Sequence, residues 1–527
     1  MSGEIPPVRL TREGSLAILC IERPPVNAID RQVRAGLHAA LDALQAEPAA
    51  AVVLYGAGRC FIAGADIGEF ERPGVAAELS ALADRLAALP MPVIAAMHGA
   101  ALGGGLELAL ASDYRLALPG TRLGLPEVGL GLIPGAGGTQ RLPRVIGLAP
   151  ALERICSGEP IAAEAAEALG LVDAVLPGET PLAAARAYLQ SQPALARRPL
   201  DPQPCPADAA ACRAWQVRLA RPGPAARELA RQAVCAAAQL PLPAGLAREA
   251  ELFEQARAGR ESQAQRRLFF AERAIPRRRE APAEGTVTCA APTRAALPAW
   301  LVTALERLPA ATPAVRLESA GTPCLQVVDA AGRQLATLRA AWPAPARVLE
   351  LAPAPPAADA LGALAVLARA ARALLLPLPG PQCISPPLAA AVAVARQRLD
   401  GAALERDWAA FGGGVSLAAI AGVGAPAVAE AAAGAPASPG LLALLACWAE
   451  AGAGLIAAGA ADAPLIDLLS VKALGFPVYR GGPMFYADAI GPSRLVAALD
   501  MHQAAGLAPA PALRQMAREG SVFYRDG

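Results

Sequence analysis

Two glutamates in the first third of the 527-residue chain, Glu107 and Glu127, each stand beside a glycine-rich segment. A pair of carboxyl groups can move protons, because one group accepts a proton while the other supplies one. Glu107 ends the segment HGAALGGGLE (98–107), in which glycines open a predicted helix. The N–H groups in the first turn of a helix are unpaired and lie at its positive end, so they stabilise negative charge. This pattern predicts acid–base chemistry on a substrate that develops an anion.

The segment RCFIAGADI (59–67) offers further backbone donors. It predicts a strand that ends in a turn of small residues, where Gly64 and its alanine neighbours let N–H groups point into a cavity. Glu107 and Glu127 lie twenty residues apart, too far to share one helix face. They can converge only if a strand predicted over 113–119 returns the chain across the domain. Each segment alone is also typical of tight packing or helix capping, but their order and spacing favour one shared site.

The elements predicted around these segments alternate between strand and helix. Strands are predicted over 15–22, 49–56 and 91–99, where apolar and β-branched residues dominate. An amphipathic helix is predicted over 31–47. This alternation is typical of an α/β domain whose sheet is covered on both faces.

Four strings of residues carry a resemblance to a known family. They are RPPVNA (23–28), IAGADI (62–67), ALGGGLELA (101–109) and PEVGLGLIPGAGGTQRL (126–142). With these motifs the chain resembles the crotonase (enoyl-CoA hydratase/isomerase) superfamily. The resemblance implies an α/β, ClpP-like spiral fold at the N-terminus and a 2-enoyl-CoA thioester as the substrate.

The resemblance also implies residue roles by position. Ala65 and Gly104 match the backbone N–H donors of the oxyanion hole, and Glu107 and Glu127 match the two catalytic carboxylates. Gly68 stands where many relatives have a basic residue, which implies weaker contacts with the CoA phosphates. A further set matches the segment that lines the CoA site: Arg59, Ala63, Asp66 and Ile67.

The rest of the chain resembles multifunctional β-oxidation enzymes, in which a crotonase domain is fused to a 3-hydroxyacyl-CoA dehydrogenase. The resemblance rests on the segment ALGFPVYRGGPMFYADAIG (473–491) and on a helical stretch over 242–274. It implies a crotonase domain, then a proline-rich segment with a helical linker, then a degenerate remnant of the Rossmann NAD domain, and two all-α dehydrogenase C-terminal-like subdomains. Their predicted bounds are 1–190, 191–275, 276–375, 376–436 and 437–527.

The dehydrogenase-like half lacks the groups that its chemistry needs. A dinucleotide site begins with a strand, a G-x-G-x-x-G turn and a helix, and the chain contains no G-x-G-x-x-G. The family's catalytic histidine would fall within 338–342, ahead of Glu350, but no histidine lies between His98 and His502. We therefore predict that NAD binding is lost and that this half serves as a scaffold.

The predicted function is hydration of trans-2-enoyl-CoA to 3-hydroxyacyl-CoA in fatty-acid β-oxidation, without a cofactor. Three alternatives remain open. The first is a Δ3–Δ2-enoyl-CoA isomerase, which needs only the second acid. The second is a non-catalytic acyl-CoA-binding or scaffold subunit, which the two carboxylates disfavour. The third is a dehydrogenase that has kept its activity.

The composition of the chain excludes some classes of partner and predicts a location. The 47 basic and 46 acidic residues leave a net charge of +1, whereas nucleic acid and anionic membranes select strongly basic surfaces. The apolar stretches 361–378 and 441–469 contain charges, so we predict buried helices and no integral membrane segment. Ten scattered cysteines and three histidines without ligand spacing predict a reduced, cytoplasmic protein without a metal site. The expected partners are an acyl-CoA and either a thiolase subunit or further copies of the chain.

Overall fold

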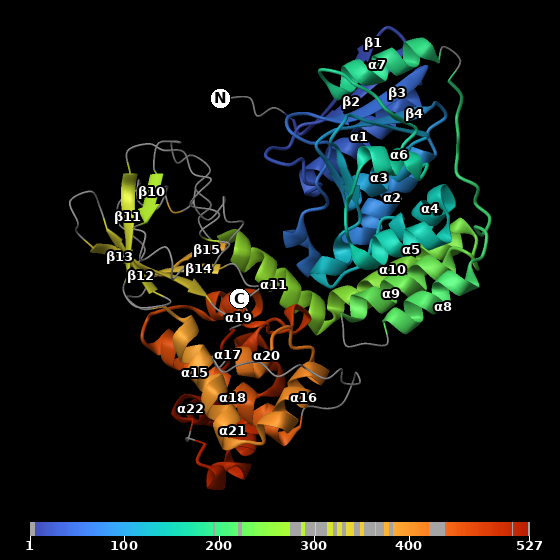
Figure 1. The fold of residues 1–527 in the computed structure, drawn as a ribbon. Helices are drawn as coiled ribbons and strands as arrows, with labels where there is room; N and C mark the ends of the chain where they lie inside the picture. Colours follow the sequence, from blue (N-terminus) through green and yellow to red (C-terminus); the bar gives the residue numbers. More distant parts are fainter. Residues whose placement is uncertain are drawn as a thin grey trace. The chain divides into compact units, whose positions relative to one another are not determined.

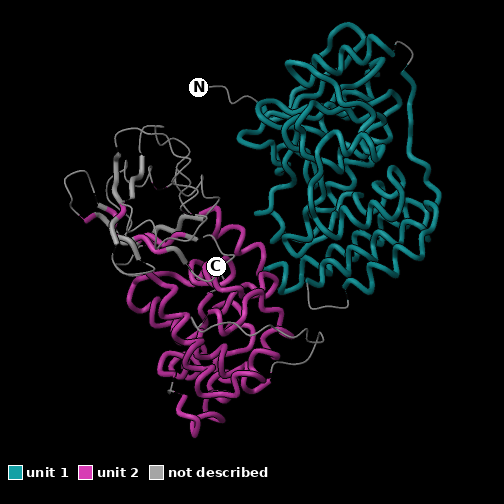
Figure 2. The backbone as a smooth tube through the Cα atoms, viewed as in Figure 1, with its two compact units in different colours: residues 1–263 teal, residues 264–527 magenta. Residues whose placement is uncertain are grey.

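The computed structural model divides the chain into two compact units, Met1–Gln263 and Ala264–Gly527 (Figure 2). Each unit is described by itself. The structure describes residues 6–192, 195–219, 224–274, 383–420, 438–507 and 510–524, and between 286 and 378 it describes six strands with Leu301, Leu364 and Leu378.

A six-stranded sheet forms the centre of unit 1 (Figure 1). Its first two strands pair antiparallel and all later neighbours pair parallel. Parallel neighbours need crossover connections, and the predicted helices supply them. In sheet order the strands are β1 (Val8–Glu13), β2 (Leu16–Ile21), β3 (Ala51–Gly56), β4 (Val93–Met97), β6 (Tyr114–Ala117) and β9 (Ala174–Val175).

Helices cover both faces of this sheet, which confirms the α/β prediction for this part of the chain. Asp30 caps the first helix by accepting from the Val33 N–H, and the helix buries Leu37 and Leu41 at helical spacing. On the other face, α7 (Pro181–Ser191) packs against β3, β4 and β6. The first helices are α1 (Arg31–Ala46), α2 (Val75–Ala87) and α3 (Gly104–Leu110).

A second, three-stranded sheet carries the glycine-rich segments. It contains β5 (Ala100–Leu102), β7 (Arg122–Gly124) and β8 (Ile161–Ala162), and β5 pairs parallel with β7. Because Leu102 pairs with Gly124, the chain just before α3 lies beside the chain just before Glu127. Strand β6 forms inside the predicted range 113–119 and returns the chain, and the β5–β7 pairing then brings the two glutamates together.

Residues 191–263, which the sequence assigned to a proline-rich segment and linker, belong to unit 1. The Cys205 N–H donates to the Ala237 carbonyl, and Trp215, Leu229 and Phe253 are buried in the core of this unit. The division after Gln263 falls inside the predicted segment 191–275, because the helices before Gln263 pack onto the first domain. The helices of this region are α8 (Ala209–Arg218), α9 (Ala225–Ala236) and α10 (Leu242–Ala258). They pack against α4 (Gly138–Ile146) and α5 (Leu148–Ser157), with which they cluster at one end of the unit in Figure 1.

Unit 2 contains a mixed six-stranded sheet where the sequence predicted a Rossmann remnant. The outer pairs β10–β11 and β14–β15 are parallel, but the three pairs between them are antiparallel. A dinucleotide-binding fold is built on parallel strands, so the described topology differs from it. The strands are β10 (Thr286–Cys289), β11 (Pro313–Ser319), β12 (Cys324–Val328), β13 (Gln334–Ala341), β14 (Val348–Ala352) and β15 (Leu374–Pro377).

The remainder of unit 2 is helical, as predicted, and its helices share one core. Trp408 stacks on Phe411 and also contacts Trp448 and Phe476, so residues from both predicted subdomains pack together. Helices α15 (Ser385–Arg398), α16 (Gly401–Phe411) and α17 (Leu417–Ile420) come first. They are followed by α18 (Pro439–Ala457), α19 (Ala463–Leu474), α20 (Pro483–Ile490), α21 (Pro492–Met501) and α22 (Pro511–Glu519).

Helix α18 is the described helix that is long and apolar enough to cross a membrane by length and composition. Half of its most apolar stretch is buried inside the protein, and it packs against α15, α20, α21 and α22. The other apolar stretch of the sequence, 361–378, lies largely outside the described residues.

The described cysteines include one disulfide pair. Cys212 and Cys235 form a disulfide, in contrast to the predicted reduced state of all thiols, because the packing of α8 on α9 brings them together. Six described cysteines are free.

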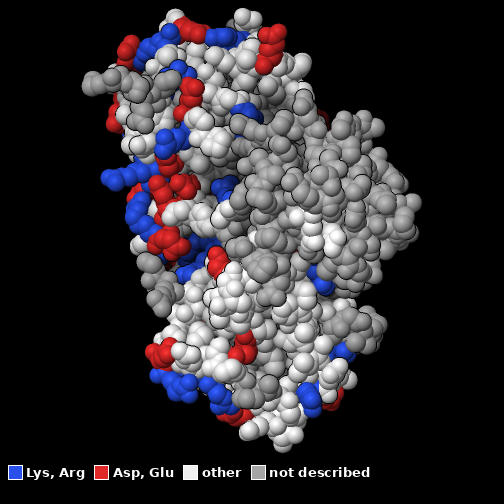
Figure 3. Space-filling view, turned by 90° about the vertical axis from the view of Figure 1, so that its left-hand side faces the viewer, with Lys and Arg blue, Asp and Glu red and all other residues white. Residues whose placement is uncertain are grey.

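On the face shown in Figure 3, Lys and Arg alternate with Asp and Glu rather than forming a patch of one sign.

Candidate active site

Two backbone N–H groups face the same space at the head of α3. Ile29 bridges the segment around Ala65: its N–H donates to the Gly64 carbonyl, and the Asp66 N–H donates to the Ile29 carbonyl. Gly104 is the first residue of α3, where an N–H has no partner within the helix. A methyl group built on Gly104 would lie 3.5 Å from the Ala65 nitrogen. Neither N–H has an acceptor among the described residues, so both can bind a substrate oxygen.

Glu107 lies in α3, buried beneath the turn that opens α4. Its Oε1 accepts from the Ala136 N–H at 2.7 Å and from the Gly138 N–H at 2.8 Å. These two bonds hold the carboxyl group in one orientation. Burial raises the pKa of Glu107, while the two N–H donors and the charge of Arg141 oppose that rise.

Glu127 begins the short 3-10 helix η2 (Glu127–Leu130). A methyl group built on Gly103 would lie 2.9 Å from Glu127 Oε1, so this carboxyl faces the glycine run directly. Its Oε2 is buried and has no hydrogen-bond partner among the described residues. Burial and the negative charge of Glu107 raise the pKa of Glu127 well above its usual range. Of the two predicted carboxyl groups, Glu127 therefore holds a proton more firmly, and Glu107 is fixed by donors that favour its ionised form.

A third carboxylate, missed by the sequence analysis, lies behind the same turn. Glu249 of α10 is buried, and it accepts from the Gly137 N–H at 2.6 Å and the Thr139 N–H at 2.8 Å. The Thr139 hydroxyl also donates to it. A sequence signal existed, because Glu249 follows Gly245 and precedes Phe253 at helical spacing on the buried face of α10.

The residues predicted to line the CoA site follow one stretch of chain around Ala65. Arg59 is exposed, and its Nε donates to the Pro25 carbonyl at 2.8 Å. Asp66 caps the 3-10 helix η1 (Ile67–Glu71) by accepting from the Gly68 N–H at 3.0 Å, and Ile67 and Ala63 are half-buried. The stretch thus borders the two free N–H groups.

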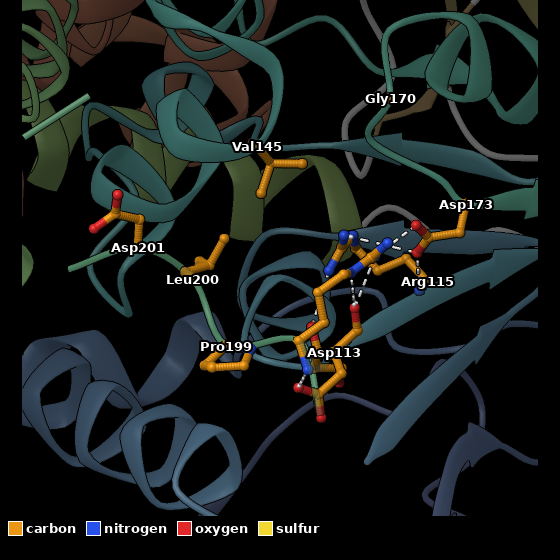
Figure 4. A pocket seen from close by; sticks show the side chains of 10 residues that line it. Asp113, Arg115, Val145, Gly170, Asp173, Pro199, Leu200 and Asp201 are labelled. Carbon is orange, nitrogen blue, oxygen red and sulfur yellow. Dashed lines mark hydrogen bonds and ion pairs between the residues drawn. The ribbon is translucent and has the colours of Figure 1, made fainter. Parts of the chain in front are cut away.

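A pocket of about 260 Å³ elsewhere in unit 1 is lined by charged groups, several of which pair with one another (Figure 4). Asp113 accepts from the Val93 and Arg198 N–H groups, and Asp173 accepts from the Arg115 N–H. Arg198 also pairs with Asp173. These bonds join the chain around Asp113 to the segments around Asp173 and Arg198.

In unit 2, Glu350 accepts hydrogen bonds from the start of a helix. It is buried on β14, its Oε2 accepts from the Ile384 N–H at 2.8 Å and the Ser385 N–H at 3.2 Å, and its cross-strand neighbour is Arg339. The bonds satisfy donors at the start of α15, and no base faces Glu350 among the described residues. These contacts of Glu350 join β14 to the start of α15. Within the described residues there is also no group of three or more His, Cys, Asp or Glu that could hold a metal.

Two free amides beside the buried Glu107 and the half-buried Glu127 form a candidate site for acid–base chemistry on a carbonyl compound. The family model for enoyl-CoA hydratase/isomerase matches residues 11–197. A probable enoyl-CoA hydratase of Bacillus subtilis (strain 168) is 46% identical over 173 residues, which are 31% of this chain and 67% of that protein. The chain belongs to the enoyl-CoA hydratase/isomerase family, within the crotonase superfamily.

Longer proteins match as well. The peroxisomal bifunctional enzyme of Danio rerio is 40% identical over 269 residues, which are 49% of this chain and 37% of that enzyme. The fatty acid oxidation complex subunit alpha of Vibrio cholerae serotype O1 is 52% identical over 141 residues, which are 25% of this chain and 20% of that subunit. The matched part thus spans well under half of either protein.

Proposed function

We propose that the chain hydrates trans-2-enoyl-CoA to 3-hydroxyacyl-CoA in fatty-acid β-oxidation. One observation carries the proposal: the free N–H groups of Ala65 and Gly104 lie beside the buried Glu107 and the half-buried Glu127, whose Oε2 is buried without a described partner. Membership of the family and the names of the matching relatives support the same reaction.

The chemistry follows from this arrangement. The thioester carbonyl oxygen binds the two N–H groups, which stabilise the enolate charge by about 3–4 kcal/mol per donor. Glu107, with an ionised carboxylate, accepts a proton as water attacks the β-carbon. Glu127 supplies the proton that the α-carbon receives, so one water molecule is added across the double bond. The two-carboxyl arrangement favours hydration over isomerisation of the double bond, which one acid can perform.

The CoA part of the substrate is assigned to Arg59, Ala63, Asp66 and Ile67. These residues border the free N–H groups, so a thioester held there would extend its nucleotide along this stretch. Gly68 is exposed and offers no cation to the phosphates.

The second half is proposed to be a degenerate dehydrogenase that does not bind NAD. The absence of a G-x-G-x-x-G turn from the sequence and the use of Glu350 to cap α15 support this proposal. A cytoplasmic location is proposed from the free cysteines, although the Cys212–Cys235 disulfide is unusual for that compartment. By similarity to a subunit of a fatty acid oxidation complex, the proposed protein partner is a thiolase subunit or a further copy of the chain.

The test is the loss of enoyl-thioester absorbance when the purified full chain is mixed with crotonyl-CoA, with and without NAD. Saturable loss that does not depend on NAD is expected. A chain that binds crotonyl-CoA without turnover would instead support a binding or scaffold subunit. Turnover of 3-enoyl-CoA alone would assign an isomerase.

A further inference from the structure

The turn that opens α4 is shared by two carboxylates. Its four consecutive N–H groups, from residues 136 to 139, alternate between them: the Ala136 and Gly138 N–H groups donate to Glu107, and the Gly137 and Thr139 N–H groups donate to Glu249. The two carboxylates thus accept from alternate N–H groups of the same peptide segment, so both fix its position.

Helix α10 is built against this turn along one face. Gly245 leaves no room for a side chain, since a methyl group there would lie 2.2 Å from Gln140 Oε1. Phe253 packs on Gly135, where a methyl group would lie 2.6 Å from Phe253 Cδ2. Glu249 lies between these two contacts at a spacing of four residues, the repeat of a helix face. The contact is therefore continuous from residue 135 to residue 140.

Burial makes the contact of Glu249 specific. The side chain is inaccessible to solvent, so its bonds to Gly137 and Thr139 cannot be exchanged for bonds to water. The charged groups that face the Glu249 carboxyl group are Glu107 of α3 and, beyond Glu107, Glu127. Arg141 of α4 donates to the Ala136 carbonyl on the same turn and pairs with Asp84 of α2. Helix α9 contributes the Ala233 carbonyl, which accepts from Gln140.

We propose that Glu249 is a positioning residue for the hydration reaction: it holds the 136–139 turn in the one shape that presents two N–H donors to Glu107, and it places a third acidic group beside the reacting pair. The inference rests on the proposed function. Glu249 lies outside residues 11–197 matched by the family model and comes from the region that the sequence assigned to a linker. The linker-like helices are thus part of the active-site support.

The charge of Glu249 adds a pH dependence to this role. Burial, and after it the charge of Glu107, raises the pKa of Glu249 to about 8. Above that pH an ionised Glu249 repels negative charge on Glu127 and keeps Glu127 protonated to higher pH. Loss of the proton from the acid sets the basic limb of the pH profile. Removing the charge of Glu249 should therefore move the basic limb to lower pH.

The experiment compares three variants of the full chain in crotonyl-CoA hydration. Glu249→Gln keeps the shape but offers one acceptor oxygen and faces the turn with N–H donors. Glu249→Asp keeps the charge but shortens the reach. Glu251→Gln is the matched control, because Glu251 lies on the same helix with its side chain 67% exposed.

We expect kcat to fall about tenfold or more in both Glu249 variants, with KM changed less than about twofold, since the lost interaction orients a reacting group. Only Glu249→Gln should move the basic limb of kcat/KM, by about one pH unit toward acid. A merely structural role would lower the active fraction equally at every pH and leave the limb in place.

The outcomes separate the inference from the proposed function. If the wild-type chain does not hydrate crotonyl-CoA, the proposed function fails and the inference fails with it. If the wild-type chain hydrates and both Glu249 variants match Glu251→Gln in kcat and pH profile, the inference alone is overturned. Should Glu249→Gln not fold, Glu249→Asp with an unchanged kcat would also overturn it.

Discussion

Buried carboxyl groups occur in both units, and their surroundings differ. In unit 2, Asp467 is fully buried, and both of its oxygens accept hydrogen bonds: Oδ1 from the Met484 N–H, Oδ2 from the Phe485 N–H and the Tyr524 hydroxyl. In unit 1, Glu127 has a buried oxygen without a described partner and a second carboxyl group, Glu107, close by. Burial raises the pKa of both groups. A raised pKa therefore does not mark the site. The like charge of a second carboxyl group marks it, since a buried oxygen without a described partner also occurs at Glu350 Oε1 in unit 2.

The same pattern recurs through unit 2. Each of four further acidic residues there accepts two consecutive backbone N–H groups and thereby ties one segment to another. Carboxylates that accept such donors satisfy groups that would otherwise be unpaired at helix starts and in turns. The residues are Glu350, Glu405, Glu450 and Asp488. These four carboxylates of unit 2 thus stabilise the fold, as Asp113 does in unit 1, whereas Glu127 lies near a second carboxyl group and has an oxygen without a described partner.

The largest expected effect comes from neutralising the catalytic pair. Glu107→Gln and Glu127→Gln keep the side-chain shape but remove the titrating proton, so hydration should fall by about 10²–10⁴-fold in each variant. Binding of an acyl-CoA, measured by calorimetry, should be retained. Asp467→Asn is the matched control from unit 2 and should keep the hydration rate of its folded fraction. Near wild-type hydration rates in either Glu variant would show that this carboxyl group of unit 1 is no more catalytic than Asp467 of unit 2.

The second effect concerns the free amides. Gly104→Ala keeps the N–H but builds a methyl group 3.5 Å from the Ala65 nitrogen and 2.7 Å from Leu79 Cδ2, so the segments that carry the two donors must shift apart. Because a displaced donor stabilises the oxyanion less, we expect kcat/KM for crotonyl-CoA to fall by up to about 10²–10³-fold, the loss seen when such a donor is removed. Gly129→Ala is the control, because no atom lies within 4 Å of a methyl group there. Equal activity of the two variants would show that the thioester oxygen lies elsewhere.

The third effect concerns the free energy of unfolding and tests whether Asp467 stabilises the fold of unit 2. Asn offers one acceptor oxygen in place of two, so Asp467→Asn should lower the free energy of unfolding by about 1–3 kcal/mol near pH 5. The pKa of Asp467 is raised to about 8 in the fold by burial, against about 3.9 in an unfolded chain. A raised folded pKa means that the stabilisation from this group is full below about pH 4 and is lost as pH rises toward 8.

Urea unfolding followed by tryptophan fluorescence tests this sign. The difference between wild type and Asp467→Asn should shrink as pH rises from 5 to 8, because Asn cannot ionise. A difference that grows over this range would mean that the three donors outweigh burial and that the carboxylate is ionised in the fold.

The smallest expected effect is that of NAD, which should change nothing. Adding NAD to the chain with a 3-hydroxyacyl-CoA should produce no NADH, since no dinucleotide turn occurs in the sequence and Glu350 caps α15. Titration with NADH at millimolar concentration should show no saturable fluorescence change. Saturable binding would reveal a nucleotide site built differently from the usual fold.

Local patterns in the sequence determined the elements and candidate residues of the first domain. The strands near 15–22, 49–56 and 91–99 and the helix near 31–47 formed where periodicity predicted them. Glycine spacing indicated the turn at Ala65 and the helix start at Gly104, because both depend on short-range backbone geometry. The catalytic roles stay predictions until they are assayed.

Only the tertiary structure decided which segments meet. The pairing of β5 with β7 brings Glu127 to Gly103, and the face of α10 brings Glu249 to a turn more than a hundred residues earlier. Such contacts depend on packing across the whole unit, and no local period encodes them. For the same reason the sequence placed a boundary at 190, where the composition changes, while the fold divides after Gln263, where the packing of apolar faces ends.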